Sequence, residues 1–246
     1  MKKEYIWVIF LVVFVVCVES FKYIKKEFFP ATEKNNVNIE NIKVEPDYEI
    51  ETLDMRITVL ESGDLKITEN IIYNLKNESD QVFRNYTLEE YAAGKINSYQ
   101  PEKLGITKIE CDGKELYEDS VTTTGIIINK DKKIGLKRYC VEYVLEDSVE
   151  MCNNISEFLC NLNLSTFEKE IKNFNLTIET QNGGEILDAR FLENDVNFVI
   201  ENGVLRANKQ NILPGSKVWV NVKLENESVP RTTRIMLEDR SEKFGE

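Results

Sequence analysis

The sequence predicts an all-β protein, an antiparallel β-sandwich of immunoglobulin-like or similar type, preceded by one N-terminal hydrophobic helix. Three observations predict it. Apolar and polar residues alternate with a period of two in many short runs after residue 48. Turn pairs such as Asp112-Gly113 and Asn202-Gly203 separate those runs, and an uncharged apolar stretch lies near the start of the chain. Period-two alternation is typical of strands with one buried face, and these turn pairs suit tight hairpins.

Residues 1–27 are predicted to be a signal anchor or a signal peptide, because an apolar run from Tyr5 to Val18 follows two lysines. The run is shorter than the roughly 20 residues that span a bilayer, which favours a cleaved signal. Glu19 and the lysines after it make a poor processing site, and lysines at both ends help a short helix to span. We prefer the anchor, which predicts a single-pass cell-membrane protein with its domain outside the cytoplasm. The alternative is secretion after cleavage.

The rest of the chain divides by composition. Residues 28–47 are Asn-rich, contain Pro30 and Pro46, and are predicted to be a polar linker. Residues 48–229 carry the alternating runs and form the predicted extracytoplasmic β-sandwich domain. Residues 230–246 form a charged C-terminal tail that cannot span a bilayer.

The strands of the domain are predicted from turns and alternation. A turn at residues 61–64 separates the first two strands. Five runs alternate most clearly, and each has one core-facing set of residues. These sets are Met55, Ile57 and Val59; Leu65, Ile67, Ile71, Tyr73 and Leu75; Tyr139, Val141, Tyr143 and Leu145; Phe174, Leu176 and Ile178; and Val218, Val220, Val222 and Leu224. Two segments, 85–103 and 148–171, lack alternation and are predicted to be loops, each with a helical turn.

Four cysteines follow the N-terminal segment, an even number that permits two disulfides in an exported chain. One arrangement joins Cys152 to Cys160 across a short loop and Cys111 to Cys140. Free buried thiols are the alternative. A zinc site is not predicted, because the chain has no histidine and no Cys-x-x-Cys spacing.

Several short stretches together resemble a known family. These are "SGDLKITENIIYNL", Arg84 in "VFRNY", "LKRYCVEYVL", "SEFLCNLNLSTFEKEIKNFNLTIET" and "LPGSKVWVNVKL". They resemble the extracellular N-terminal domain of the predicted membrane proteins called domain of unknown function 2207, across roughly residues 49–224. The resemblance implies an outer β-sandwich followed by transmembrane helices, and it implies no particular activity. The chain departs from the family in its charged tail, and in having Cys160-Asn161 where the family tends to have Trp-Asn.

Glu69 breaks the alternation of its strand, because it lies where a core-facing apolar residue is expected. A buried carboxylate is tolerated only when it is paired or hydrogen-bonded. The resemblance makes Arg84 the natural partner, in a structural ion pair whose planar guanidinium meets the carboxylate with two bonds. The alternative is a β-bulge near Glu69 and Asn70 that turns the carboxylate to solvent.

Composition narrows the possible functions. A formal net charge of -12 opposes nucleic-acid binding, which needs clustered Lys and Arg. Without histidine there is no Ser-His-Asp triad or Cys-His pair, and no Gly-rich phosphate loop is present. We therefore expect no catalytic residues, no cofactor and no metal. The sequence favours a non-enzymatic module that binds an unknown protein or envelope polymer. The alternative is a carboxylate-dependent hydrolase acting on an envelope glycan.

Overall fold

The computed structural model describes residues 46–78, 84, 103–116, 121–122, 125–126, 133–152, 154–192 and 196–232. The chain divides into two units, Met1–Lys43 and Val44–Glu246, and all the described residues lie in the second. The predicted N-terminal helix, nearly all of the linker and the tail from residue 233 lie outside them. Within the described ranges, no helix has both the length and the apolar character needed to cross a membrane.

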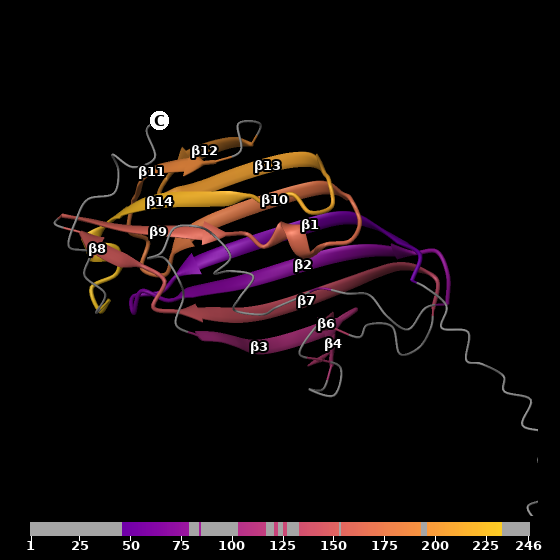
Figure 1. Ribbon diagram of the computed structural model, residues 1–246. Helices are drawn as coiled ribbons and strands as arrows, with labels where there is room; N and C mark the ends of the chain where they lie inside the picture. Colours follow the sequence, from indigo (N-terminus) through magenta and orange to yellow (C-terminus); the bar gives the residue numbers. More distant parts are fainter. Residues whose placement is uncertain are drawn as a thin grey trace, which may run out of the picture. The chain divides into compact units, whose positions relative to one another are not determined.

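The described part is mostly β, in two main sheets (Figure 1). The larger sheet contains β1 (Tyr48–Val59), β2 (Leu65–Leu75), β3 (Lys103–Cys111), β4 (Lys114–Glu115), β7 (Gly135–Glu146), β10 (Ile171–Thr180), β12 (Asn197–Glu201) and β13 (Val204–Ile212). The smaller contains β8 (Glu150–Cys152), β9 (Ile155–Asn161), β11 (Ile186–Phe191) and β14 (Trp219–Glu225). Two short strands, β5 (Val121–Thr122) and β6 (Gly125–Ile126), pair with each other, and the 3-10 turns are η2 (Leu164–Thr166) and η3 (Asn226–Ser228).

The strand order of the larger sheet is β12-β13-β10-β1-β2-β7-β3-β4, and that of the smaller is β11-β14-β9-β8. Neighbouring strands run antiparallel, as predicted, with one correction. β1 and β10 are parallel, with Ile57 opposite Ile178 in the middle of the larger sheet. No local signal in the sequence could have shown this, because the two strands lie more than a hundred residues apart along the chain.

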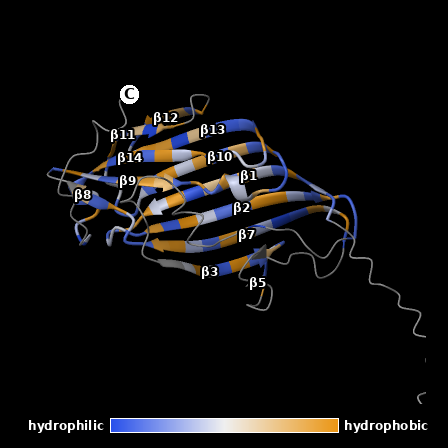
Figure 2. Ribbon diagram, viewed as in Figure 1, coloured by the Kyte–Doolittle hydropathy of each residue, from blue (hydrophilic) through white to orange (hydrophobic). Residues whose placement is uncertain are grey.

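Alternation sets the buried face of the larger sheet, and bands of opposite hydropathy run along its strands (Figure 2). In β2 every second residue is buried, from Leu65 to Leu75. The core-facing residues predicted for β1, β2, β7, β10 and β14 are all buried. One hydrophobic cluster draws on both sheets, with Ile57 and Tyr143 from the larger and Phe158 and Val222 from the smaller. Burial of this apolar surface is the main stabilising contribution to the fold.

The predicted hairpins are present. Asp112 and Gly113 connect β3 to β4 with φ values of 49° and 75°, and Asn202 and Gly203 connect β12 to β13 with 53° and 72°. Two successive positive φ values twist the turn to match the right-handed twist of the strands.

The segment 148–171 was predicted to be a loop, and this prediction is wrong. It contains the antiparallel hairpin of β8 and β9 and then η2. From Ser156 to Asn161 every residue of β9 is buried, on both faces of the strand. A strand buried on both faces has no reason to alternate, so its period-two signal is absent. The other predicted loop, 85–103, lies almost entirely outside the described residues.

Candidate functional site

Glu69 lies on the core face of β2 and its side chain is fully buried. The pairing of β1 with β2 is continuous around it, with Met55 opposite Glu69 and Asp54 opposite Asn70. The irregularity between these strands lies further along, between Ile50 and Thr52. The bulge that would have turned the carboxylate to solvent is therefore not at this position.

The structure brings Glu69 and Arg84 together. Arg84 Nη2 donates to Glu69 Oε1 at 2.6 Å and Arg84 Nε donates to Glu69 Oε2 at 3.0 Å, and neither side chain is exposed. Two parallel bonds between a guanidinium and a carboxylate are the strongest geometry for such a pair. Tyr143, from the neighbouring strand β7, donates a third hydrogen bond to Glu69 Oε1 at 2.8 Å.

The other side of the guanidinium holds the segment that follows β9. Arg84 Nη1 donates to the backbone oxygen of Asn163 at 2.7 Å and to the hydroxyl of Thr166. The guanidinium also lies over the ring of Phe167, 4.4 Å from its centroid. The pair thus joins β2, β7 and the η2 segment inside the core. Because it is enclosed and each charge is compensated, its role is structural.

The predicted disulfides are not formed, because Cys140 and Cys160 are free thiols. Cys152 lies opposite Ile155 in the β8–β9 hairpin, so Cys160 is five residues further along β9, roughly 17 Å away at about 3.3 Å per residue. A disulfide needs Cα atoms within about 7 Å of each other. Cys111 lies opposite Tyr139 and Cys140 opposite Glu110, so Cys111 and Cys140 lie on different faces of the sheet.

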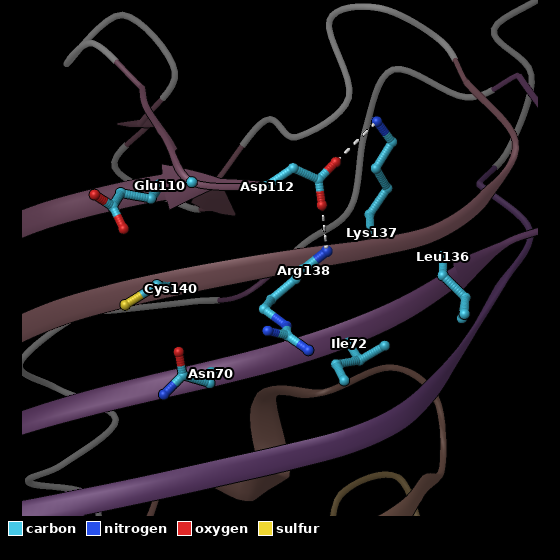
Figure 3. Close-up of a pocket in the computed structure, with 9 residues that line it drawn as sticks. Asn70, Ile72, Glu110, Asp112, Leu136, Lys137, Arg138 and Cys140 are labelled. Carbon is cyan, nitrogen blue, oxygen red and sulfur yellow. Dashed lines mark hydrogen bonds and ion pairs between the residues drawn. The ribbon is translucent and has the colours of Figure 1, made fainter.

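A pocket of about 560 Å³ lies on the outward face of the larger sheet, over β2, β3 and β7 (Figure 3). Most of its lining residues alternate with core residues along their strands and therefore point outward. Lys137 is the exception, because it has the register of the core-facing Tyr139 and is largely buried. They are Asn70 and Ile72 of β2, Glu110, Asp112 and Gly113 of β3 and its turn, and Leu136, Lys137, Arg138 and Cys140 of β7. No pattern in the sequence indicated this pocket, since it depends on how the three strands are placed side by side.

The hairpin turn at the edge of the pocket is tied to β7. Asp112 Oδ1 accepts a hydrogen bond from the backbone nitrogen of Arg138 at 3.0 Å, and the backbone nitrogen of Asp112 donates to the Arg138 oxygen at 2.8 Å. Asp112 Oδ2 contacts Lys137 Nζ at 3.3 Å. These contacts hold the wall of the pocket in place before any ligand arrives (Figure 3).

The charges around the pocket are mostly compensated. Three lysines near it contact carboxylates, in the pairs Lys137–Asp112 at 3.3 Å, Lys108–Glu110 at 2.9 Å and Lys66–Glu142 at 3.0 Å. Arg138 differs from them. Among the described residues, no ion pair involves its guanidinium, which Figure 3 shows extending over β2 between Asn70 and Ile72.

Cys140 does not have the character of a nucleophile. Burial raises the pKa of its thiol, and the Glu142 carboxylate raises it further. A reactive cysteine needs a lowered pKa, because the thiolate is the nucleophile. In the part of the chain that the structure describes, no group of three or more Cys, Asp or Glu side chains is placed to hold a metal ion.

A row of polar side chains crosses the same outward face, continuing away from the pocket. Its members lie opposite one another on five successive strands and are Asn70 of β2, Asp54 of β1, Asn175 of β10, Asn208 of β13 and Asn197 of β12. We call these five residues the polar row. Asn175 Nδ2 donates to Asp54 Oδ1 at 2.7 Å. All members but the half-buried Asn70 are exposed.

The chain is similar to one protein family and to several solved structures. A family model described as "Predicted membrane protein (DUF2207) N-terminal domain" matches residues 49–224. Among curated proteins, no sequence matches the chain.

Several solved peptidase structures have a similar chain trace. Native leukotriene A4 hydrolase from Saccharomyces cerevisiae has 13% identity and a TM-score of 0.47, covering 72% of this chain and 29% of that one. An M1 zinc metallopeptidase from Deinococcus radiodurans has 8% identity and a TM-score of 0.43, covering 71% and 42%. Legionella pneumophila aminopeptidase A has 9% identity and a TM-score of 0.39, covering 72% and 21%. The chain thus spans less than half the length of each, and these likenesses do not bear on its activity.

The family match includes both members of the buried ion pair, every residue that lines the pocket and the whole polar row. The resemblance seen in the sequence motifs is confirmed. The chain belongs to the DUF2207 family of predicted membrane proteins, of which residues 49–224 form the N-terminal domain.

Proposed function

We propose that the protein is a membrane-tethered, extracytoplasmic binding module of β-sandwich architecture, held in the membrane by a single N-terminal helix. Its domain binds a polymer or protein of the cell envelope and does not turn it over. The observation that carries this proposal is the preformed pocket on the outward face of the larger sheet, whose rim is fixed by the contacts of Asp112. Binding sites are commonly concave, largely preformed and equipped with a few fixed polar groups.

The best-enclosed carboxylate of the described chain supports binding over turnover. Glu69 is fully buried and receives hydrogen bonds from Arg84 and Tyr143. A catalytic acid or base must reach the atom whose proton it transfers. Glu69 cannot do this while it is enclosed by its partners.

The hydrolase alternative has one observation in its favour, because the pocket contains two carboxylates, Glu110 and Asp112. Glycoside hydrolysis needs one carboxyl group kept protonated by an apolar or crowded environment beside a second that stays ionised. The side chain of Asp112 is 47% exposed and contacts Lys137, and that of Glu110 is 26% exposed and contacts Lys108. Neither carboxylate has the enclosure that a protonated acid requires, so binding is the better-supported function.

Co-sedimentation of the full chain, kept in mild detergent, with lipid-free envelope polymer tests this proposal. We expect saturable binding and no release of soluble sugar fragments above a protein-free control. Removal of lipid from the polymer ensures that the N-terminal helix does not cause the binding. Absence of binding would contradict the proposal. Fragment release that is lost in both Glu110→Gln and Asp112→Asn would replace it with the hydrolase.

A further inference from the structure

The pocket and the polar row form one continuous surface, because Asn70 belongs to both. From Asn70 the row crosses four further strands to Asn197 at the edge of the larger sheet. Neighbouring strands lie about 4.8 Å apart, so the row is roughly 19 Å long. A ligand that enters the pocket can therefore extend along the row.

Four of the five members of the row carry amide groups, and the fifth, Asp54, has a carboxylate that accepts a hydrogen bond from Asn175. Each Asn side chain presents two N–H donors and one carbonyl acceptor, which suits hydroxyl groups that both donate and accept. Asparagine is depleted in strands, because its side chain competes for backbone hydrogen bonds. A polar residue at an outward strand position keeps the surface soluble, and Thr or Lys would do this at least as well as Asn. Four asparagines occupy this row of five outward positions, so the row offers a ligand four amide groups.

The charge of the pocket points to an acidic group. Lys137, Lys108 and Lys66 are each compensated by a carboxylate of the protein, whereas Arg138 has no ion pair among the described residues. A planar guanidinium binds a carboxylate through two parallel hydrogen bonds. The Asn70 amide and the aliphatic side chains of Ile72 and Leu136 line the pocket around it.

We propose that this surface binds an acidic polysaccharide, with a sugar carboxylate held by Arg138 in the pocket and the hydroxyl groups of the following sugars held along the polar row. The inference rests on the proposed function and names the ligand class of that binding module. Other ligand classes fit less well. A polyphosphate chain needs clustered cations, whereas this protein has a net charge of -12 and Lys137, Lys108 and Lys66 are already paired with carboxylates. A lipid or an apolar peptide needs an apolar surface, which the row lacks.

A matched pair of ligands tests the acidic group. An oligogalacturonate carries carboxylates, and its methyl-esterified form has the same sugars without the charge. Isothermal titration of the full chain in mild detergent should show at least about tenfold tighter binding of the acid, as expected for hydrogen bonds between charged groups. Equal binding of the two forms, or binding of neither, would overturn the inference.

Variants of the pocket make the same test specific. Arg138→Gln should remove the preference for the acid, and Arg138→Lys should retain only part of it, because an ammonium has no planar fork. The side chain of Arg138 is exposed and only its backbone contacts Asp112, so the fold should be kept. Arg190→Gln is the matched control, since Arg190 is an exposed arginine of β11 on the other sheet. Equal losses in Arg138→Gln and Arg190→Gln would show non-specific attraction and contradict the assignment.

Oligomer length tests the polar row. Affinity should rise from the single sugar acid to longer oligomers until the ligand spans the row. Asn208→Val should remove most of this gain while leaving binding of the single sugar acid within twofold. Valine suits an exposed strand position, and among the described residues the Asn208 side chain makes no hydrogen bond. A length dependence that is unchanged in Asn208→Val would exclude the row from the site.

The outcomes separate this inference from the proposed function. If the full chain sediments with envelope polymer and Arg138→Gln sediments equally well, the module binds a ligand but not through this site. If the chain binds no envelope polymer at all, the proposed function itself is wrong. Tight binding of the acid that Arg138→Gln abolishes supports both.

Discussion

At the scale of single residues, the fold depends on one buried charge, Glu69, that receives three hydrogen bonds from two partners. Glu69 receives two hydrogen bonds from Arg84 and one from Tyr143, and Arg84 also binds the backbone of Asn163. Removal of either charge leaves the other uncompensated in the core, which costs more than the pair contributes to the free energy of folding. The segment after β9 is held to β2 by this pair.

Glu69→Gln and Arg84→Ala should each lower the free energy of unfolding by roughly 3–5 kcal/mol, the usual cost of breaking a buried pair. The double variant should lose clearly less than the two single losses combined, because the second change removes a charge that was already without its partner. Urea denaturation of the four proteins measures this. Glu179→Gln is the control, since Glu179 contacts Arg56 at the surface and should lose far less. Strictly additive losses would contradict the coupling.

Cys160 should resist alkylation in the folded protein. Burial raises the pKa of its thiol to about 12, from an ordinary value near 9. Below pH 9 the thiol is protonated in both the folded and unfolded states. Above pH 9 the thiol ionises in the unfolded chain before it does in the folded protein. The stability that the protonated, buried thiol contributes is therefore lost as the pH rises towards 12. Site-resolved mass spectrometry after iodoacetamide treatment between pH 7 and 9 should show half-buried Cys140 labelled well before Cys160. Equal labelling rates under native conditions would be evidence against an enclosed thiol.

At the scale of elements, local turn chemistry determined which strands could be predicted. The β3–β4 and β12–β13 hairpins were predicted from Asp112-Gly113 and Asn202-Gly203, because their backbone conformation is a property of two residues. The β8–β9 hairpin was missed, because burial on both faces removes alternation. The pairing of Glu69 with Arg84 was expected only through the family's motif. The pocket and the polar row were not predicted, because they depend on the register of strands that are distant in the sequence.

The turn after β10 packs closely against η3 at Gly184, so a larger residue at this position should destabilise the fold. A Cβ on Gly184 would overlap the Ser228 hydroxyl, whose side chain is fully buried. Gly184→Ala should therefore lower the free energy of unfolding by about 1–3 kcal/mol, the usual effect of overpacking. Gly105→Ala in β3 is the matched control, because a Cβ there meets nothing within 4 Å. Thermal denaturation compares the two. A Gly184→Ala variant as stable as Gly105→Ala would show that η3 moves away without cost.

At the scale of the whole described domain, the two sheets depend on each other. The larger sheet has an apolar face, the smaller sheet has another, and one cluster contains residues of both. The parallel pairing of β1 with β10 also brings together segments that lie more than a hundred residues apart in the sequence. Neither sheet could bury its apolar face alone.

The two sheets should therefore unfold in one transition. Trp219 lies in β14 of the smaller sheet, so its fluorescence in a Trp7→Phe background reports on that sheet, whereas circular dichroism is dominated by the larger one. Both probes should give the same urea midpoint. Leu224→Ala, which removes a fully buried side chain of β14, should lower both midpoints together, at a cost of about 2–5 kcal/mol. If fluorescence changed at lower urea than circular dichroism, and Leu224→Ala widened that gap, the smaller sheet would be an independent layer. The shared core would then not be what holds the domain together.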